Sequence, residues 1–583
     1  MSAPERDPLV LVLGGGIAVV GCVWSGAQLG ALVASRTVLP IGLGDAMAAL
    51  FRLPRVVEEP AAAWPEAVSR SLPGWPLYWT ATVVAALAIA TAVTWTWSRL
   101  HPAVGVEGRH RLGVETESRL ATRRDLAPMA VRRSVAGRFT LGKVGRKLVA
   151  TEDRRGAPAR GRRARRRQGD RSAVAVIGPA RCGKTANTIS EILEWEGPAV
   201  LSSVKSDLLG ATLSRRRALG EVRVFDPTGS TGIDTAGWSP LRASATVTGA
   251  QKAARALVDA GPKSGAENLE FFGAMAEQLL WPMLFAAAAG GRSMSDVVRW
   301  VLGQDRPMDG SPGEVVAVLD ALLVSGGPDR RAEASLAMRA LESTWLLDDR
   351  TRGGAYATAK TLLRAWEDPA VAASAIVQEI DLDWLVSGAN TLYICAPMHE
   401  QARLAPVFGG LLGDLLQQAY ERVNRTQEPL PNLLLVMDEA GNTPAAWLPS
   451  VASTCASIGM LLVTVWQSVA QINAAYGRLA DSVLTNHGTK IIFSGVSDAA
   501  TLDYASRLLG HEEVLQHGLS SDDGAGRRTV SDSTARRELV PVDVLRMVAP
   551  FQALLLHGTL RPAHLHARPY YRDRRLRRLA DGR

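Results

Sequence analysis

Two long stretches near the start of the chain contain no charged side chain: Val10–Ala34 and Leu77–Trp97. Each is long enough to form a helix across the apolar core of a bilayer, which takes about 20 residues. Aromatic residues occupy both ends of the second stretch, as they do in membrane-spanning helices: Tyr78, Trp79, Trp95 and Trp97. We therefore predict a membrane anchor in residues 1–100, with transmembrane helices at about 9–34 and 77–97.

A different pattern begins at Ser172, where short apolar runs alternate with longer segments of mixed polarity. The runs have the length and composition of buried strands, and they lie at 174–177, 199–204, 221–225, 390–396, 433–437, 460–465, 490–493 and 551–557. Strands that alternate with helices at this spacing are typical of a largely parallel sheet with crossover helices. This part of the sequence therefore predicts an α/β fold.

The strand pattern is interrupted between Ala243 and Ile380, where every segment with a clear period reads as a helix. We predict an all-alpha domain at 243–384. It would be inserted into the sheet domain, which then comprises 172–242 and 385–565.

The distribution of charged residues predicts the orientation of the chain in the membrane. The net charge is +9, the loop Ser35–Pro76 is balanced, and arginine is concentrated after Trp97. Because basic flanks stay on the cytoplasmic side, we predict a two-pass protein of the inner (cytoplasmic) membrane, with both termini and the sheet domain in the cytoplasm. The four cysteines are scattered without a C-x-x-C pair, which argues against a disulfide framework or a zinc site.

Three further segments are basic or polar. Residues 101–171 read as a basic cytoplasmic linker that has some apolar positions, such as Leu141 and Val149, and ends in a flexible arginine cluster at 162–167. The cluster suits contact with DNA phosphates, contact with anionic lipid, or a role only in setting topology. Residues 515–537 read as a mobile loop, and 566–583 as a basic, frayed C-terminal tail.

The first predicted strand of the sheet is followed by a recognisable sequence motif. Gly178–Thr185 is a complete G-x-x-x-x-G-K-[ST] P-loop between a strand and a helix. Backbone N–H groups of such a loop bind phosphates, Lys184 reaches the β- and γ-phosphates, and the Thr185 hydroxyl binds Mg²⁺. We predict an ATP and Mg²⁺ site with these nucleotide-binding residues: Gly178, Pro179, Ala180, Arg181, Cys182, Gly183, Lys184, Thr185 and Ala186.

A second motif supplies the carboxylates that a P-loop needs. The apolar run Leu433–Met437 ends in Asp438 and Glu439. Asp438 would bind Mg²⁺ together with Thr185, and Glu439 would act as the general base on the attacking water. Gln467 follows the run 460–465 and would sense the γ-phosphate or its water, so Lys184, Glu439 and Gln467 are the predicted catalytic residues.

Several of these segments together resemble the type IV coupling proteins of the TraG/TraD/VirD4 family, the conjugative DNA transfer ATPases. The resemblance covers most of the chain. It rests on the P-loop, Lys205-Ser-Asp207, Phe225-Asp226-Pro227, Leu269-Glu-Phe-Phe, Leu434–Glu439, Trp466-Gln467-Ser468-x-x-Gln471, Ala475-Tyr476-Gly477, Asn486, Phe493 and Arg537-Glu-Leu-Val-Pro541. The most specific part is the Gln-Ser-x-x-Gln run after the Asp438–Glu439 strand.

The resemblance implies a RecA-like P-loop NTPase domain and a homo-hexameric ring on the membrane. Such a ring would bind a complex of single-stranded DNA and relaxase, deliver it to the components of a type IV secretion channel, and drive transfer by ATP hydrolysis. Two alternatives remain. One is a double-stranded DNA translocase like FtsK/SpoIIIE, whose hydrolysis duplex DNA would stimulate. The other is a nucleotide-dependent docking platform for protein cargo, with little hydrolysis.

Overall fold

The computed structural model describes residues 8–100, 110–112, 114–115, 118–151, 173–203, 206–261, 269–308, 310–442, 445–521 and 528–582. The chain forms two compact units, residues 1–116 and 117–583. Two parts of the predictions, the arginine cluster at 162–167 and Lys205, lie outside the described residues.

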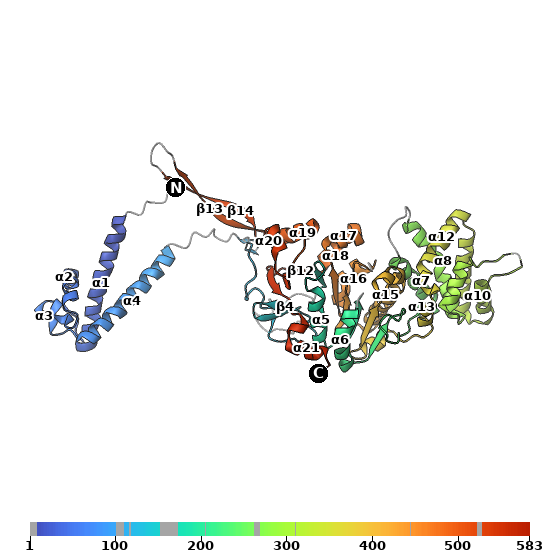
Figure 1. Cartoon of the computed structure of the whole chain (residues 1–583), viewed down its shortest axis with the longest axis horizontal. Helices are drawn as coiled ribbons and strands as arrows, with labels where there is room; N and C mark the ends of the chain where they lie inside the picture. Colours follow the sequence, from blue (N-terminus) through green and yellow to red (C-terminus); the bar gives the residue numbers. More distant parts are fainter. Residues whose placement is uncertain are drawn as a thin grey trace. The chain divides into compact units, whose positions relative to one another are not determined.

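The first unit consists of two long helices and a folded connection. Helices α1 (Pro8–Ser35) and α4 (Trp75–Leu100) pack against each other, and α2 (Leu43–Arg52) and α3 (Glu66–Ser69) lie in the connection (Figure 1). The two long helices approach closely at Gly26, where an added Cβ would lie 2.4 Å from the Thr82 hydroxyl. By length and composition, Ala18–Ser35 and Trp75–Thr96 could each cross a membrane, and so could a third helix, Glu270–Ala289, in the second unit.

The second unit is built on a 12-stranded sheet with the strand order β3-β5-β4-β16-β15-β12-β6-β11-β10-β7-β9-β8. The strands are β3 (Ala130–Val131), β4 (Thr140–Val144), β5 (Lys147–Ala150), β6 (Val174–Ile177), β7 (Ala199–Ser203), β8 (Val222–Phe225), β9 (Thr391–Cys395), β10 (Leu433–Met437), β11 (Met460–Trp466), β12 (Thr489–Phe493), β15 (Gln552–His557) and β16 (Ala563–His566). All neighbours from β12 to β8 are parallel, and all neighbours from β3 to β12 are antiparallel.

Both faces of the parallel part of the sheet are buried, and successive residues of a strand therefore belong to the apolar cores on opposite faces. In β10, Leu435 belongs to one apolar cluster and Leu434 and Val436 belong to the other. Helices α5 (Lys184–Glu194) and α6 (Ser206–Leu219) cover one face, to which they contribute Ile192 and Leu208. The opposite core includes residues of α15 (Gln401–Thr426) and α16 (Leu448–Ile458), so the sheet lies between two helical layers.

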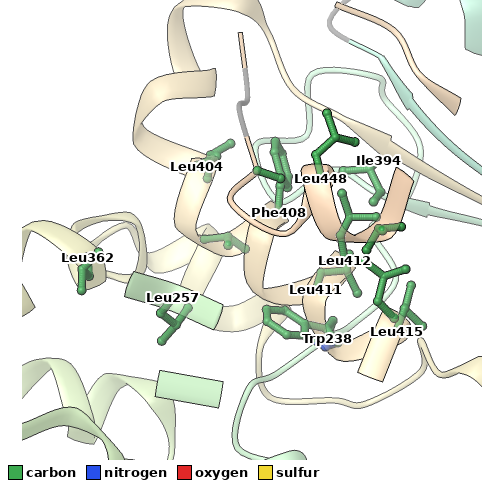
Figure 2. Packing of buried hydrophobic residues seen from close by; sticks show 14 of the residues in the cluster. Trp238, Leu257, Leu362, Ile394, Leu404, Phe408, Leu411, Leu412, Leu415 and Leu448 are labelled. Carbon is green, nitrogen blue, oxygen red and sulfur yellow. The ribbon is translucent and has the colours of Figure 1, made fainter. Parts of the chain in front are cut away.

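A group of helices separates β8 from β9 in the sequence. They are α7 (Val247–Ala260), α8 (Leu269–Ala289), α9 (Met294–Leu302), α10 (Glu314–Ser325), α11 (Pro328–Trp345), α12 (Asp349–Leu363), α13 (Pro369–Ser374) and α14 (Leu382–Val386) (Figure 1). The apolar helix α8 is the central member and contacts α7, α11 and α12, so its composition is explained by burial in this core. Helix α15 joins these helices to the sheet, since Leu411 and Leu415 pack in one cluster with Trp238, Leu257 and β9 (Figure 2).

The eight strands predicted in the α/β part are present, but β16 (Ala563–His566) was not predicted, and the three polar segments differ from the prediction. Residues 118–151, predicted to belong to the linker 101–171, contribute β3, β4 and β5 to the main sheet. Their apolar side chains are buried, as at Phe139 and Leu141. Residues 515–537, predicted to be a mobile loop, largely belong to a hairpin of β13 (His511–Ser521) and β14 (Arg528–Glu538). Two short strands in the first unit, β1 (His110–Arg111) and β2 (Val114–Glu115), also pair.

The basic C-terminal segment is also folded. It contains α21 (Arg574–Ala580), whose Leu576 is fully buried with Ile189 and Leu193 of α5. The remaining helices of this unit follow β11 and β12: α17 (Val469–Tyr476), α18 (Ala480–Asn486), α19 (Ala499–Leu509) and α20 (Val542–Met547). The prediction of a frayed tail at 566–583 is therefore wrong for its described part, because Leu576 and Leu579 of a largely arginine helix pack in one cluster with residues of α5.

Candidate active site at the P-loop

The P-loop connects β6 to α5 at the carboxyl end of the parallel strands. Gly178 ends the strand, and its N–H donates to the Trp466 carbonyl of β11 over 3.1 Å. A Cβ at this position would lie 2.8 Å from the Phe493 Cβ and 2.9 Å from the Cys182 sulfur, so only glycine fits. The backbone has a positive φ at Arg181 (65°) and at Gly183 (108°), which curls the loop.

The side chains of the loop differ in their exposure. Cys182 is buried and burial raises the pKa of its thiol, whereas Ala180 and Arg181 are exposed. The Lys184 ammonium lies within the loop, where it donates hydrogen bonds to the Gly178 and Pro179 carbonyls. Thr185 and Ala186 are half-buried in the first turn of α5. The helix N-terminus and the inward-facing lysine together make this loop suited to an anion.

The predicted carboxylates lie at the same edge of the sheet. Asp438 directly follows β10 and is only 8% exposed. Its N–H donates to the Ser202 carbonyl over 2.9 Å, and its carboxylate accepts from the Ser203 hydroxyl over 3.4 Å. A half-buried threonine hydroxyl and a buried aspartate are oxygen ligands of the kind that Mg²⁺ prefers, so Thr185 and Asp438 fit the predicted ion chemically.

Glu439 has an unusual backbone for a glutamate. Its φ is 60°, in the left-handed region, which non-glycine residues seldom adopt except where the surroundings enforce it. The next ladder bond, from the Ala440 N–H to the Val465 carbonyl over 3.0 Å, holds this turn against β11. The Asn442 amide donates to the Glu439 carboxylate over 2.8 Å and orients it. Glu439 is half-buried, so water can reach it.

Gln467 completes this side of the site. It is exposed at the end of β11, directly after the residue that bonds Gly178. Its N–H donates to the Gln471 side-chain oxygen over 2.9 Å. Because β11 lies between β6 and β10, the sheet places Gln467 between the P-loop and Asp438–Glu439. The fold thus brings all the predicted site residues to one edge of the sheet.

A second set of residues around the P-loop was not predicted. Phe551 packs against Gly183, where an added Cβ would lie 2.6 Å from its ring, and its N–H donates to the Cys182 carbonyl over 3.3 Å. Arg568 forms an ion pair with Glu194 of α5 over 2.8 Å, and both side chains are almost fully buried. These contacts join residues more than 350 positions apart, and no local sequence pattern predicts such pairings.

The fold and the site define a P-loop protein of the α/β class. A family model described as type IV secretory system conjugative DNA transfer matches residues 137–581. Because that match spans most of the chain, the protein belongs to this family and is a type IV coupling protein.

Solved structures of the coupling protein TrwB share the fold. The trigonal form of TrwBdeltaN70 in complex with sulphate has a TM-score of 0.56 at 17% identity, with coverage of 80% of this chain and 96% of that chain. The complex of TrwB with the non-hydrolysable GTP analogue GDPNP has a TM-score of 0.50 at 16% identity, with coverage of 68% and 85%. No curated protein sequence matches the chain.

Proposed function

We propose that this protein is a membrane-anchored ATPase of type IV secretion. It would couple a DNA–relaxase or protein substrate to the secretion channel and drive the transfer of single-stranded DNA by ATP hydrolysis. The observation that carries this proposal is the arrangement of residues at one edge of the sheet. There the P-loop, Gln467 and the Asp438–Glu439 pair follow the neighbouring strands β6, β11 and β10. Membership of the conjugative DNA transfer family supports the choice of substrate.

The site residues have distinct roles in this mechanism. Lys184 leaves the loop carbonyls and binds the β- and γ-phosphates of ATP, while Thr185 and Asp438 hold Mg²⁺. The ion, when bound, neutralises charge that develops on the phosphate oxygens. Glu439 accepts a proton from the attacking water, and Asn442 keeps the carboxylate in position for this step. Gln467 positions the same water or contacts the γ-phosphate.

The remaining organisation is proposed on the same basis. Residues 1–100 form a two-pass anchor in the cytoplasmic membrane, with the termini and the ATPase domain in the cytoplasm. A RecA-like domain of residues 172–242 and 385–565, to which 118–151 add strands and α21 adds a helix, contains an all-alpha insertion at 243–384. Six copies form a ring, as the family resemblance implies, and backbone contacts to single-stranded DNA are sensitive to salt and tolerant of sequence.

The test is ATP hydrolysis by the full chain in lipid nanodiscs, with and without single-stranded DNA, at two salt concentrations. We expect single strands to raise the rate, salt to suppress the rise, and Lys184→Ala to abolish turnover. Glu439→Gln should lower kcat by about 10²–10⁴ because the general base is lost. Glu428→Gln is the matched control, since this exposed carboxylate lies before β10, at the opposite end of the strand.

Two outcomes contradict the proposal. Turnover that duplex DNA stimulates and single strands do not would indicate a double-strand translocase. Nucleotide binding with turnover that is absent, or indifferent to DNA and to Glu439→Gln, would indicate a docking platform.

A further inference from the structure

Helix α2 of the first unit has apolar side chains on two faces. Ala46 and Ala49 are buried in the core of this unit. Leu43, Met47 and Phe51 are each at least half exposed, and their spacing of four residues places them on one face of the helix. A helix that is apolar all round is typical of a buried setting. The exposed face of α2 therefore predicts a second apolar contact.

The length of α1 sets the depth at which α2 lies. Helix α1 has 28 residues and is therefore about 42 Å long, whereas the apolar core of a bilayer is about 30 Å thick. Trp24 precedes Ser35, the last residue of α1, by 11 residues, which corresponds to about 16 Å. Even if the whole excess of about 12 Å projects from the membrane on this side, Trp24 lies inside the apolar core.

Helix α2 begins at the same depth as Trp24. The Trp24 indole N–H donates to the carbonyl of Ile41, two residues before α2, over 3.0 Å. Helix α2 then lies beside α1 (Figure 1), and Ala46 and Ala49 share a core with Val23 of α1. Its exposed face is therefore level with the boundary of the apolar core of the bilayer.

The connection around α2 is built for an apolar setting. The Gln28 amide donates to the Leu39 carbonyl over 2.7 Å, and the Gln28 oxygen accepts from the Leu39 N–H over 2.9 Å. Beyond α2, the Trp79 indole donates to the Val57 carbonyl over 3.1 Å. Non-helical backbone is tolerated at membrane depth only where other groups of the protein satisfy it. Trp24, Gln28 and Trp79 do so for this connection.

We infer that α2 lies in the lipid leaflet at the connection end of the anchor, with Leu43, Met47 and Phe51 in contact with acyl chains. The inference rests on the membrane anchor of the proposed function and adds to it a helix that enters one leaflet without crossing the bilayer. Arg52 is exposed in the last turn of α2. Its long side chain can reach lipid phosphates while its stem stays among apolar groups.

The test measures the depth of single positions in the full chain in lipid nanodiscs. The chain carries Cys22→Ser, because the other three cysteines are buried, and a fluorophore is attached at Met47→Cys or at Phe51→Cys. A helix of this kind buries its apolar face about 5–10 Å below the headgroups. We therefore expect lipids with a nitroxide near the headgroup to quench both labels more than lipids with a nitroxide near the chain end, and aqueous iodide to quench neither label.

Two further positions are the controls. Leu87 is exposed in the middle of the apolar helix α4, so a label at Leu87→Cys should be quenched most by the deep nitroxide. Glu66 is an exposed carboxylate at the start of α3, so a label at Glu66→Cys should be quenched by iodide and by neither lipid. Without lipid quenching at Leu87→Cys, the membrane anchor itself fails, and this inference fails with it.

With lipid quenching at Leu87→Cys, the labels on α2 decide the inference alone. If iodide quenches them and the lipids do not, α2 lies in water. If neither iodide nor lipid quenches them, another protein surface or a second copy of this chain covers α2. Either result overturns the inference. Met47 and Phe51 are both exposed, so each label decides the question if the other variant does not fold.

Discussion

The sequence predicted the residues on one side of the P-loop but not those on the other side. On the β10–β11 side, Asp438, Glu439 and Gln467 each follow an apolar run, and parallel strands bring their carboxyl ends to one edge. On the opposite side, Phe551 and Arg568 reach the loop and α5 through contacts with residues far away in the sequence. Motifs therefore predict residues that strand geometry places, and they do not predict residues that long-range packing places.

The C-terminal side depends on one buried cluster. Ser190 donates to the Arg568 carbonyl, and the Arg568 N–H donates to the Asn187 side-chain oxygen over 2.8 Å. The Arg568 guanidinium makes two bonds to the Glu194 carboxylate, of 2.8 and 3.1 Å. Burial raises the pKa of the neighbouring Glu191 well above its ordinary value, which favours its neutral form. Glu194 and Arg568 thus form the central ion pair of this contact.

The largest expected effect is on this ion pair. Arg568→Ala leaves the Glu194 carboxylate, whose side chain is only 2% exposed, in an apolar setting with the partly exposed Arg575 as its other partner. Removal of one member of a buried pair typically costs about 3–5 kcal/mol. We expect the free energy of unfolding to fall by that amount in urea titrations of the full chain in detergent.

Arg575→Ala is the matched control for that experiment. Arg575 contacts the same carboxylate over 3.2 Å, but its side chain is 58% exposed. Its loss should cost about 1 kcal/mol or less, since solvent screens exposed pairs. Equal effects of the two substitutions would show that the C-terminal segment is docked by surface charge, and the contrast between the two sides of the P-loop would then be wrong.

The β11 side has a buried network of its own, which the sequence did not predict. The Val483 carbonyl accepts from His487 Nδ1 over 2.6 Å, so Nε2 accepts from the Thr464 hydroxyl over 2.9 Å. That hydroxyl oxygen in turn accepts from the Trp466 indole over 2.8 Å. His487 is fully buried. The network supports the end of β11, just before Gln467, and it requires a neutral imidazole.

A dependence of stability on pH follows from this network. Burial lowers the pKa of His487 from 6.5 to about 4, so the folded state binds fewer protons than the unfolded state between these values. Stability should therefore fall as pH falls from about 6.5 to about 4, by about 3 kcal/mol in total for this group. Above pH 6.5 the group should have no effect.

The measurement is urea unfolding at pH 7.0, 6.0 and 5.0 for the wild type and His487→Gln. The variant should be less stable at pH 7, but its stability should fall less between pH 7 and 5. Lys490, which donates to the His487 carbonyl, has a pKa lowered by burial to about 8 and stays protonated throughout this window. Parallel pH profiles for the two proteins would rule out His487 as the titrating group.

How far the sequence predicted the fold depended on how each segment is stabilised. The strands of the parallel sheet are continuous apolar runs with both faces buried, and such runs are recognisable without knowledge of their partners. Strands β3, β4 and β5 are short and lie in an arginine-rich segment, so apolar residues such as Leu141 and Val149 were noticed but did not make a recognisable strand pattern. Helix α21 reads RRLRRLA and is docked by its leucines and a partner on α5. Its place in the fold could not be inferred from its own composition.

The smallest effect expected is kinetic and concerns Gln471. Its oxygen accepts from the Gln467 N–H, and its amide carbon occupies the space that a Cβ of Gly441 would fill, at 2.1 Å. Gln471 therefore connects the end of β11 to the turn after Glu439. It contacts backbone around the site and is a positioning residue. Gln471→Ala should lower kcat about 10- to 100-fold through displacement of Gln467 and Glu439, with ATP affinity changed less than about threefold.

The measurement is steady-state hydrolysis together with ATP binding by calorimetry, on the wild type, Gln471→Ala and a control variant from the same helix. Asn473 is exposed on α17, so Asn473→Ala should leave both kcat and ATP affinity unchanged. A Gln471→Ala variant that loses ATP affinity and kcat in equal measure would place its role in binding.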